Sequence, residues 1–213
     1  MVPALDALAR LREGNRRFAT NQPSAAALSN AERAALISRQ EPFAIILGCS
    51  DSRVPAELVF DQGFGDLFVI RVAGNIVAPS QVGSVEFAAS RFGTRLVVVM
   101  GHTQCGAITA TLEELQGHST TQSSNLRSIV NRVRPAVASL LSRKGDHDPE
   151  ALVREAVRAN VRASVNHLQH GSELLERLAA ETGLLVVGSE YSLETGVVDF
   201  FDNGPNGSGG PGL

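Results

Sequence analysis

Four short, almost uninterrupted apolar runs dominate the hydrophobic pattern of the chain. They cover residues 43–48, 67–72, 96–101 and 184–188. Runs of this length without polar alternation are typical of parallel strands buried on both faces of a sheet. After the last run, a turn at 194–196 leads into residues 197–201.

Helical periodicity fills the intervals between these runs. Apolar residues recur every three or four positions within 82–92, 108–115, 129–140 and 153–168. Pro135 is expected to kink or restart the third of these helices. The fourth helix should run from about Pro149 to Gly171, after which Ser172 can cap another helix. Because strands alternate with helices, the pattern predicts an α/β fold with a mainly parallel central sheet flanked by helices.

The N-terminal region has a different pattern. Residues 4–19 place Leu8 and Leu11 on one face, which predicts an amphipathic helix interrupted near Gly14. A second short helix is expected over 31–39, so that residues 1–40 form a helical arm. With no linker in between, residues 1–203 are predicted to be a single domain. The glycine-rich residues 204–213 are predicted to be a disordered tail.

Composition restricts the function classes. The 213 residues carry a formal net charge of −3 and a pI near 6.0, which argues against a surface for nucleic acid or anionic membranes. The 43% hydrophobic content is enough for one substantial core. Apolar runs stay far short of the roughly 20 residues of a membrane-spanning helix, and the N-terminus lacks the order of a secretory signal. A cytoplasmic location is therefore expected.

Two clusters of reactive side chains follow predicted strands. Cys49, Asp51 and Arg53 come directly after the first strand, and His102 and Cys105 end the third. In an open parallel sheet the carboxyl ends of the strands face the crevice where ligands bind. One cysteine plus a His-x2-Cys pair supplies the ligand set of a zinc site with one open position. An open position is typical of catalytic zinc.

Each of these residues also has a structural interpretation. A single cysteine at the end of an apolar strand is most often part of the core, and His102 could be a core or capping histidine. The two cysteines could instead form a disulfide. Asp51 and Arg53 favour a polar site, because unpaired charges are costly to bury beside Cys49. Together the residues favour a metal site over these alternatives.

Three segments closely resemble the β-class carbonic anhydrases. They are CSDSRVPAE at 49–57, FVIRVAGN at 68–75 and GHTQCGA at 101–107. The similarity extends from about residue 11 to residue 196. It implies an enzyme that hydrates carbon dioxide reversibly to bicarbonate and a proton, by attack of zinc-bound hydroxide. It also implies assignments for five residues: Cys49, His102 and Cys105 as Zn²⁺ ligands, and Asp51 and Arg53 as the catalytic dyad.

The resemblance extends to the substrate pocket. It implies that Gln40, Phe68 and Phe87 line a small pocket for carbon dioxide, with Phe87 at a position where tyrosine is common. Gly106 is expected in the first turn of a helix, where a peptide N–H can donate to a bicarbonate oxygen. Asp51 is also expected to be able to become the fourth zinc ligand in a closed state.

The chain resembles the plant-like subgroup. Another subgroup has a regulatory bicarbonate pocket built from a tryptophan, an arginine and a tyrosine. Arg71 and Tyr191 match the last two, but Ile46 stands at the tryptophan position and the chain has no tryptophan. A full regulatory pocket is therefore not expected.

The resemblance implies self-association. Similar proteins are homodimers or larger assemblies whose N-terminal helices embrace the neighbour, with active sites at the dimer interface. Two other functions stay open at this stage. One is hydrolysis of carbonyl sulfide or carbon disulfide on the same fold, and the other is a non-catalytic module stabilised by zinc.

Overall fold

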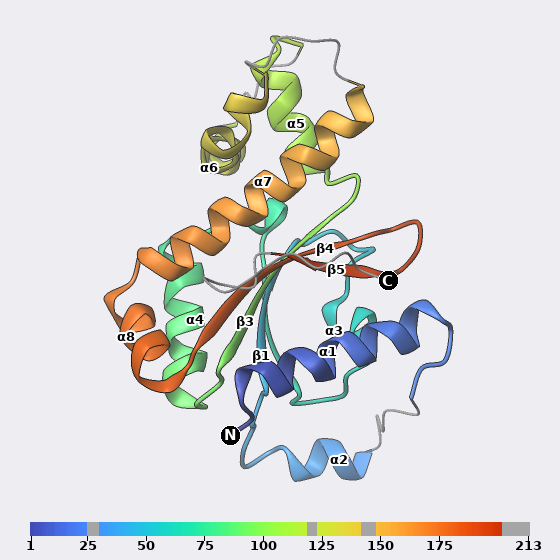
Figure 1. Cartoon of the computed structure of the whole chain (residues 1–213), viewed down its shortest axis with the longest axis vertical. Helices are drawn as coiled ribbons and strands as arrows, with labels where there is room; N and C mark the ends of the chain where they lie inside the picture. The colour runs from blue at the N-terminus through green and yellow to red at the C-terminus, as the bar shows by residue number, and fades with distance from the viewer. Residues whose placement is uncertain (25–29, 119–122, 142–147, 202–213) are drawn as a thin grey trace.

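The structure, a computed structural model, describes residues 1–24, 30–118, 123–141 and 148–201 (Figure 1). In chain order its elements are α1 (Ala4–Ala19), α2 (Asn30–Ala35), β1 (Ala44–Gly48), α3 (Ala56–Val59), β2 (Leu67–Arg71), the 3-10 turn η1 (Ala73–Asn75), α4 (Pro79–Arg91), β3 (Leu96–His102), α5 (Gly106–Leu115), α6 (Ser124–Leu141), α7 (Pro149–His170), α8 (Glu173–Thr182), β4 (Leu185–Tyr191) and β5 (Val198–Phe201).

The strands form one sheet in the order β2-β1-β3-β4-β5. The first four strands are parallel, and β5 pairs antiparallel with β4 at one edge. Each strand predicted from the apolar runs is present, and helices connect the parallel strands. The mainly parallel α/β sheet expected from the sequence is therefore confirmed.

Side chains alternate between the two faces of the sheet, and each face has its own helical layer. Ile46 and Val98 pack with Leu11 of α1 on one face. Ile45 and Val97 pack on the other face with residues of α4, α7 and α8. Figure 1 shows α1 on one side of the sheet and these three helices on the other. Burial on both faces explains why the strands have no polar alternation.

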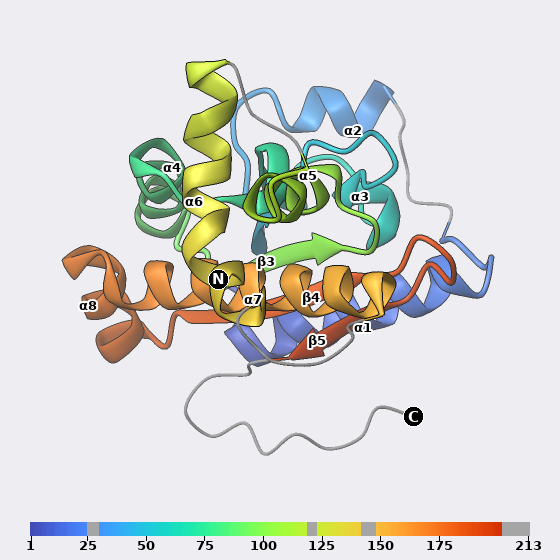
Figure 2. The ribbon, with the colours of Figure 1, turned by 90° about the horizontal axis from the view of Figure 1, so that it is seen from above.

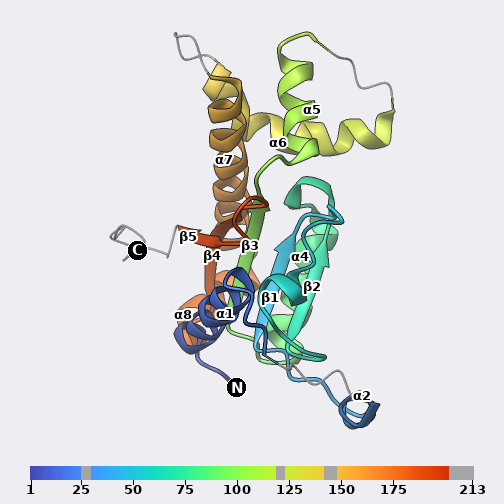
Figure 3. The same ribbon diagram turned by 90° about the vertical axis from the view of Figure 1, so that its right-hand side faces the viewer.

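A third apolar cluster lies beyond the carboxyl ends of β1 and β3. Ile108 of α5, Val133 of α6 and Val157 of α7 pack there beside Cys49 and Cys105. The helices α5 and α6 stand at this end of the molecule, uppermost in Figures 1 and 3 and toward the viewer in Figure 2. They cover the edge of the sheet where the reactive residues were expected.

The expected break of the first helix near Gly14 is wrong, because α1 is continuous over this residue. Gly14 marks a close approach instead. A Cβ atom built on Gly14 would lie 1.9 Å from the carbonyl oxygen of Phe60. The next residue, Asn15, donates to the carbonyls of Val59 and Gly196 and accepts from the Val198 N–H. The helix is thus fastened to this chain's own sheet, and its contact with a second copy stays a prediction.

Other boundaries also differ from the expected ones. The helix α2 ends at Ala35, four residues earlier than expected. The helix α6 passes through Pro135 as one element rather than restarting there. The predicted tail at 204–213 lies outside the described residues. Within the described ranges, none of the helices combines the length and the hydropathy that crossing a membrane requires.

The close approach at Gly14 generates a stability prediction. Gly14→Ala should lower the free energy of unfolding by at least about 2 kcal/mol, because the methyl group collides with backbone rather than with a flexible side chain. Gly83→Ala is the matched control, since Gly83 is also helical but a Cβ there meets nothing within 4 Å. The control should be neutral or stabilising by up to about 1 kcal/mol. Urea unfolding measures both, and equal effects would contradict the packing argument.

Candidate functional site

The parallel pairing of β1 and β3 brings the two reactive clusters together. Cys49 follows the last residue of β1, His102 ends β3, and Cys105 caps α5. The Nε2 or Nδ1 atom of the histidine and the two Sγ atoms all lie within 4.8 Å of one another. All three residues are buried, with His102 fully so. Three metal-binding side chains thus converge in a region closed to bulk water.

The hydrogen bonding of His102 leaves one ring nitrogen available. Its Nδ1 lies 2.9 Å from the carbonyl oxygen of Thr103, which can only accept, so Nδ1 carries the proton. The Nε2 atom is buried and has no hydrogen-bond partner among the described residues. An unpaired buried acceptor costs about 1–3 kcal/mol. This arrangement, with one nitrogen oriented by a carbonyl and the other free, is that of a metal ligand.

The two thiols affect each other's ionisation. Their Sγ atoms are 4.0 Å apart, about twice the length of a disulfide bond, and both cysteines are free. A hydrogen bond from Cys105 lowers the pKa of Cys49 below its usual range, helped by the N–H of Gly74. The hydrogen bond to Cys49 and burial raise the pKa of Cys105. One negative charge therefore forms readily, and the second needs a cation.

The donor set fits zinc. A divalent cation would stabilise both thiolates and would give the unpaired Nε2 atom of His102 a coordination partner. Two sulfur ligands and one imidazole bind Zn²⁺ in preference to harder cations such as Mg²⁺, which favour oxygen ligands. The structure leads to the same three residues, Cys49, His102 and Cys105, as the sequence.

Asp51 and Arg53 form a bidentate ion pair beside these ligands. Oδ1 of Asp51 accepts from the Nε of Arg53 at 2.9 Å and from its backbone N–H at 3.0 Å, and Oδ2 accepts from Nη2 at 2.8 Å. These hydrogen bonds hold the pKa of Asp51 well below its usual range. Oδ2 also lies 3.9 Å from Nε2 of His102. The carboxylate is therefore charged, oriented and adjacent to the buried ligands.

Arg71 is a supporting residue whose role here the sequence did not indicate. Its Nε donates to the carbonyl of Cys49 at 3.0 Å, and its Nη2 donates to the carbonyl of Asp51 at 2.6 Å. Sequence comparison matched Arg71 only to a regulatory pocket of another subgroup. The available signal is positional, because Arg71 ends β2 directly opposite Gly48 of the neighbouring strand. Arg71 thus holds the loop that carries both Cys49 and the carboxylate of Asp51.

Glu194 plays the same part for the second loop. Its carboxylate accepts from Thr103 Oγ1 at 3.0 Å and from Gln104 Nε2 at 2.8 Å. These two residues lie between His102 and Cys105, and Gln104 has a left-handed backbone with φ of 56°. The sequence indicated only a turn at 194–196. The structure shows that this turn reaches across to fix the His-x2-Cys segment.

The expected pocket residues lie elsewhere in this chain. Phe68 and Phe87 stack with Phe92 in an aromatic cluster, with ring centroids 5.6 to 6.3 Å apart. Phe68 is opposite Ile45, four strand residues before Cys49, which corresponds to about 13 Å. Exposed Gln40 comes even earlier, before β1 begins. Figure 3 shows α2, which precedes it, at the end of the sheet opposite α5. The structure therefore does not bring these three residues to the Cys49, His102 and Cys105 cluster of the same chain.

Gly106, in contrast, lies at the ligand cluster. It is the first residue of α5, directly after Cys105, and it is exposed. A Cβ atom built on it meets nothing within 4 Å. Gly106 therefore has open space beside its Cα at the N-terminus of this ten-residue helix.

Comparison with known proteins identifies the family. The sequence model of the carbonic anhydrase family matches residues 44–198. Carbonic anhydrase 2 of Mycobacterium tuberculosis is 39% identical over 186 residues, which cover 87% of each chain. The chain belongs to the β-carbonic anhydrase family. The enzyme class implied by the sequence resemblance is thereby confirmed, whereas the plant-like subgroup stays a prediction.

Solved structures agree with the fold. The β-carbonic anhydrase CafA of Aspergillus fumigatus superposes with a TM-score of 0.74 at 24% identity, covering 93% of this chain and 90% of that one. One of two tetrameric β-carbonic anhydrases of Sordaria macrospora gives 0.70 at 25% identity, covering 81% and 87%. The five-stranded sheet described above is therefore the fold of this carbonic anhydrase family.

The two hydrogen bonds of Arg71 generate a prediction for the site. Arg71→Met keeps the aliphatic stem but removes both donors, so the loop of Cys49 and Asp51 should loosen. We expect a loss of about 1–2 kcal/mol in the free energy of unfolding and slower hydration of carbon dioxide. Arg177→Met, at an exposed position on α8, is the control and should change neither. Wild-type stability and rate in Arg71→Met would contradict the role assigned to Arg71.

Proposed function

We propose that this β-carbonic anhydrase catalyses the zinc-dependent, reversible hydration of carbon dioxide to bicarbonate and a proton. The observation that carries the proposal is the charged Asp51–Arg53 pair directly beside three buried metal-binding side chains. The relatives named carbonic anhydrase support the substrate. Carbon dioxide and bicarbonate are therefore the proposed substrate and product.

The proposed metal ligands are the Sγ atoms of Cys49 and Cys105 and the Nε2 atom of His102. A zinc ion bound there would supply a Lewis acid that lowers the pKa of a coordinated water. The protein keeps this cation in a dry, apolar surrounding made by residues such as Ile76 and Ile108. Two thiolates make the centre close to neutral, so the neighbouring polar groups have to assist the reaction.

Asp51 and Arg53 supply this assistance. Oδ2 of Asp51 faces the ligand cluster and can accept a hydrogen bond from the attacking water, which orients the water oxygen toward carbon dioxide. Arg53 keeps that carboxylate ionised and holds it in place with two side-chain hydrogen bonds. At the start of α5, the Gly106 N–H is proposed to donate to the bicarbonate that forms.

Asp51 has a second proposed role. In a closed state it would leave Arg53 and become the fourth ligand of zinc, which would exclude water. The structure has Asp51 in the other arrangement, paired with Arg53. The exposed position of the Arg53 side chain supports a pair that can open, since solvent can take over its hydrogen bonds.

A second copy of the chain would complete the pocket. Gln40, Phe68 and Phe87 lie far from the ligands of their own chain, so they can line the pocket only from a neighbouring subunit. The exposed position of Phe87, at 54%, is consistent with a surface that another subunit covers. The tetrameric relative also supports self-association. We therefore propose a homodimer or larger assembly with the active site between subunits.

The other candidate functions predict different measurements. A carbonyl sulfide or carbon disulfide hydrolase would keep the same metal ligands but release hydrogen sulfide. A non-catalytic zinc module would close the fourth metal position with a permanent protein ligand. The ion pair of Asp51 with Arg53 favours the enzyme over that module. The proposed compartment is the cytoplasm, where the free thiols of Cys49 and Cys105 would stay reduced.

The metal assignment is tested by zinc content. We expect about one zinc per chain in the wild type, and loss of most of it in Cys49→Ser and Cys105→Ser, because a hydroxyl is a much poorer zinc ligand than a thiolate. Ser52→Ala, an exposed change in the same loop, should keep the metal. Elemental analysis is paired with assays of carbon dioxide hydration and of sulfide release. Full zinc in either cysteine variant, or sulfide release faster than hydration, would refute the proposal.

The role of the carboxylate is tested by Asp51→Asn. The variant should keep its zinc but hydrate carbon dioxide at least about tenfold more slowly, the scale of lost orientation by a neighbouring group. Glu57→Gln, which neutralises an exposed carboxylate on α3, is the control. Stopped-flow assays with measured zinc content separate slow catalysis from lost metal. A wild-type rate in Asp51→Asn would exclude Asp51 from the reaction.

The shared pocket is tested by mixing two defective chains. Gln40→Ala and Asp51→Asn should each be slow alone. A mixed dimer would contain one site with both defects and one intact site, so the purified mixed dimer should have about half of the wild-type sites, and an unpurified random mixture about a quarter. Co-expression of differently tagged chains, followed by two-step purification, isolates the mixed species. If mixing restores no activity, both residues act in the site of one chain.

A further inference from the structure

The 3-10 turn η1 has an unusual backbone next to the metal ligands. Gly74 has φ of 71° and Asn75 has φ of 42°, so two successive residues are in the left-handed region. A Cβ atom on Gly74 would lie 3.1 Å from the Cβ of Ala107 on α5. The turn is therefore both conformationally demanding and closely packed on one side. Such a backbone persists only where its surroundings hold it.

This turn contacts a proposed zinc ligand directly. The backbone N–H of Gly74 donates to the Sγ atom of Cys49 at 3.3 Å. A hydrogen bond to a thiolate withdraws electron density from the sulfur and orients it toward the metal. The direction of this N–H depends on the conformation of η1, because Gly74 lies inside the turn.

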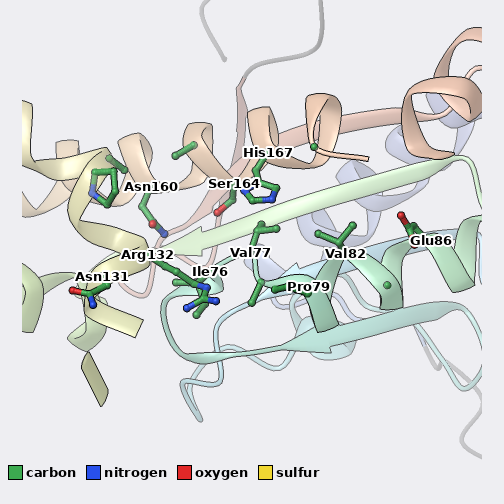
Figure 4. A pocket seen from close by; sticks show the side chains of 16 residues that line it. Ile76, Val77, Pro79, Val82, Glu86, Asn131, Arg132, Asn160, Ser164 and His167 are labelled. Atoms are coloured by element: carbon green, nitrogen blue, oxygen red, sulfur yellow. The ribbon is translucent and has the colours of Figure 1, made fainter. Parts of the chain in front are cut away.

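Two buried side chains of α7 hold the turn from the opposite side. Asn160 Nδ2 donates to the Gly74 carbonyl at 2.8 Å, and Ser164 Oγ donates to the Asn75 carbonyl at 3.1 Å. Figure 4 shows both side chains pointing from α7 into the space between that helix and the segment of Ile76 and Val77. The mechanism derived above uses neither residue. The Gly74 N–H belongs to the peptide unit just before the two that these side chains bind, so their bonds fix the backbone of η1 on the carboxyl side of that N–H.

A groove lies beside the two side chains of α7 that hold the turn. Asn160 and Ser164 line a groove of about 760 Å³ between α4, α6 and α7 (Figure 4). Ile76 and Val77, which follow η1, line the same groove. Gly74 and Asn75 do not line the groove and are themselves buried. Asn160 and Ser164 thus lie between the buried turn and the groove, and they contact the turn through the two hydrogen bonds described above.

We propose that Asn160 and Ser164 are positioning residues of the metal centre, which orient the Gly74 N–H toward the Cys49 sulfur through the turn η1. The chain of contacts runs from α7 through the Gly74 and Asn75 carbonyls to the thiolate. This inference rests on the proposed zinc function. According to this proposal, α7 influences how strongly the Cys49 thiolate binds the metal, although none of the ligands lies on that helix.

The test replaces zinc by Co²⁺, whose thiolate-to-metal absorption reports on the cobalt–sulfur bonds. Asn160→Ala should shift or weaken this absorption band and speed zinc release to a colorimetric chelator by about tenfold, the lower end of the effects of groups behind metal ligands. Ser164→Ala should change the absorption band and the rate of zinc release in the same direction, but by less, because it removes a smaller group. Asn166→Ala is the matched control, because Asn166 is an exposed asparagine on the same helix.

The outcomes are distinguishable. A wild-type chain that binds neither zinc nor Co²⁺ overturns the proposed function, and this inference with it. A wild-type chain that binds both metals, with an unchanged band and unchanged zinc release in folded Asn160→Ala, overturns the inference alone. Thermal unfolding monitored by circular dichroism establishes folding. If Asn160→Ala does not fold, Ser164→Ala decides, and values equal to those of Asn166→Ala overturn the proposal.

Discussion

The parallel pairing of β1 with β3 is the constraint on which the site depends. Gly48 is in register with Met100, so the residue after β1 necessarily lies beside the last residues of β3. Cys49 and His102 are 53 positions apart in the chain, yet the sheet fixes them as neighbours. A shift of one residue in either strand would turn every side chain to the opposite face and separate the ligands. The apolar runs on both strands prevent this shift, because each face is buried under its own helices.

The site has a buried part, the cluster of Cys49, His102 and Cys105, and a partly exposed part, the ion pair of Asp51 with Arg53. His102 Nε2 and the two sulfurs are buried, so their interactions with a cation would be strong, and Nε2 has no hydrogen-bond partner among the described residues. Asp51 and Arg53 lie at the border, where both can stay charged at moderate cost. Arg71 and Glu194 then hold the two loops that connect these zones. The site can therefore hold a cation away from water and keep a charged carboxylate next to it at the boundary with solvent.

The sequence predicts what periodicity and local spacing determine. The strands and most helices follow from apolar patterns, and the cluster of Cys49, His102 and Cys105 follows from their places at the carboxyl ends of the first and third strands. The packing of Gly14 is not predictable from the sequence, because the close approach of Phe60 is a tertiary contact without a local signal. Arg71 and the Asn160 contact were missed for the same reason, since each acts on a backbone carbonyl far away in the chain. Which backbone carbonyl a side chain contacts depends on the topology of the fold, and the local sequence gives no signal for it.

The distance between the aromatic cluster and the metal ligands constrains the assembly. If Phe87 of one subunit lines the site of another, a closed pair related by a two-fold axis makes the relation reciprocal, and both sites are complete. An open chain of subunits would leave the copy at one end with an incomplete site. The exposed ring of Phe87 also favours closure, because an apolar surface left uncovered at the end of an assembly costs free energy. Completeness of the pocket and burial of the cluster therefore favour the same arrangement, a closed pair of two copies or an assembly of such pairs.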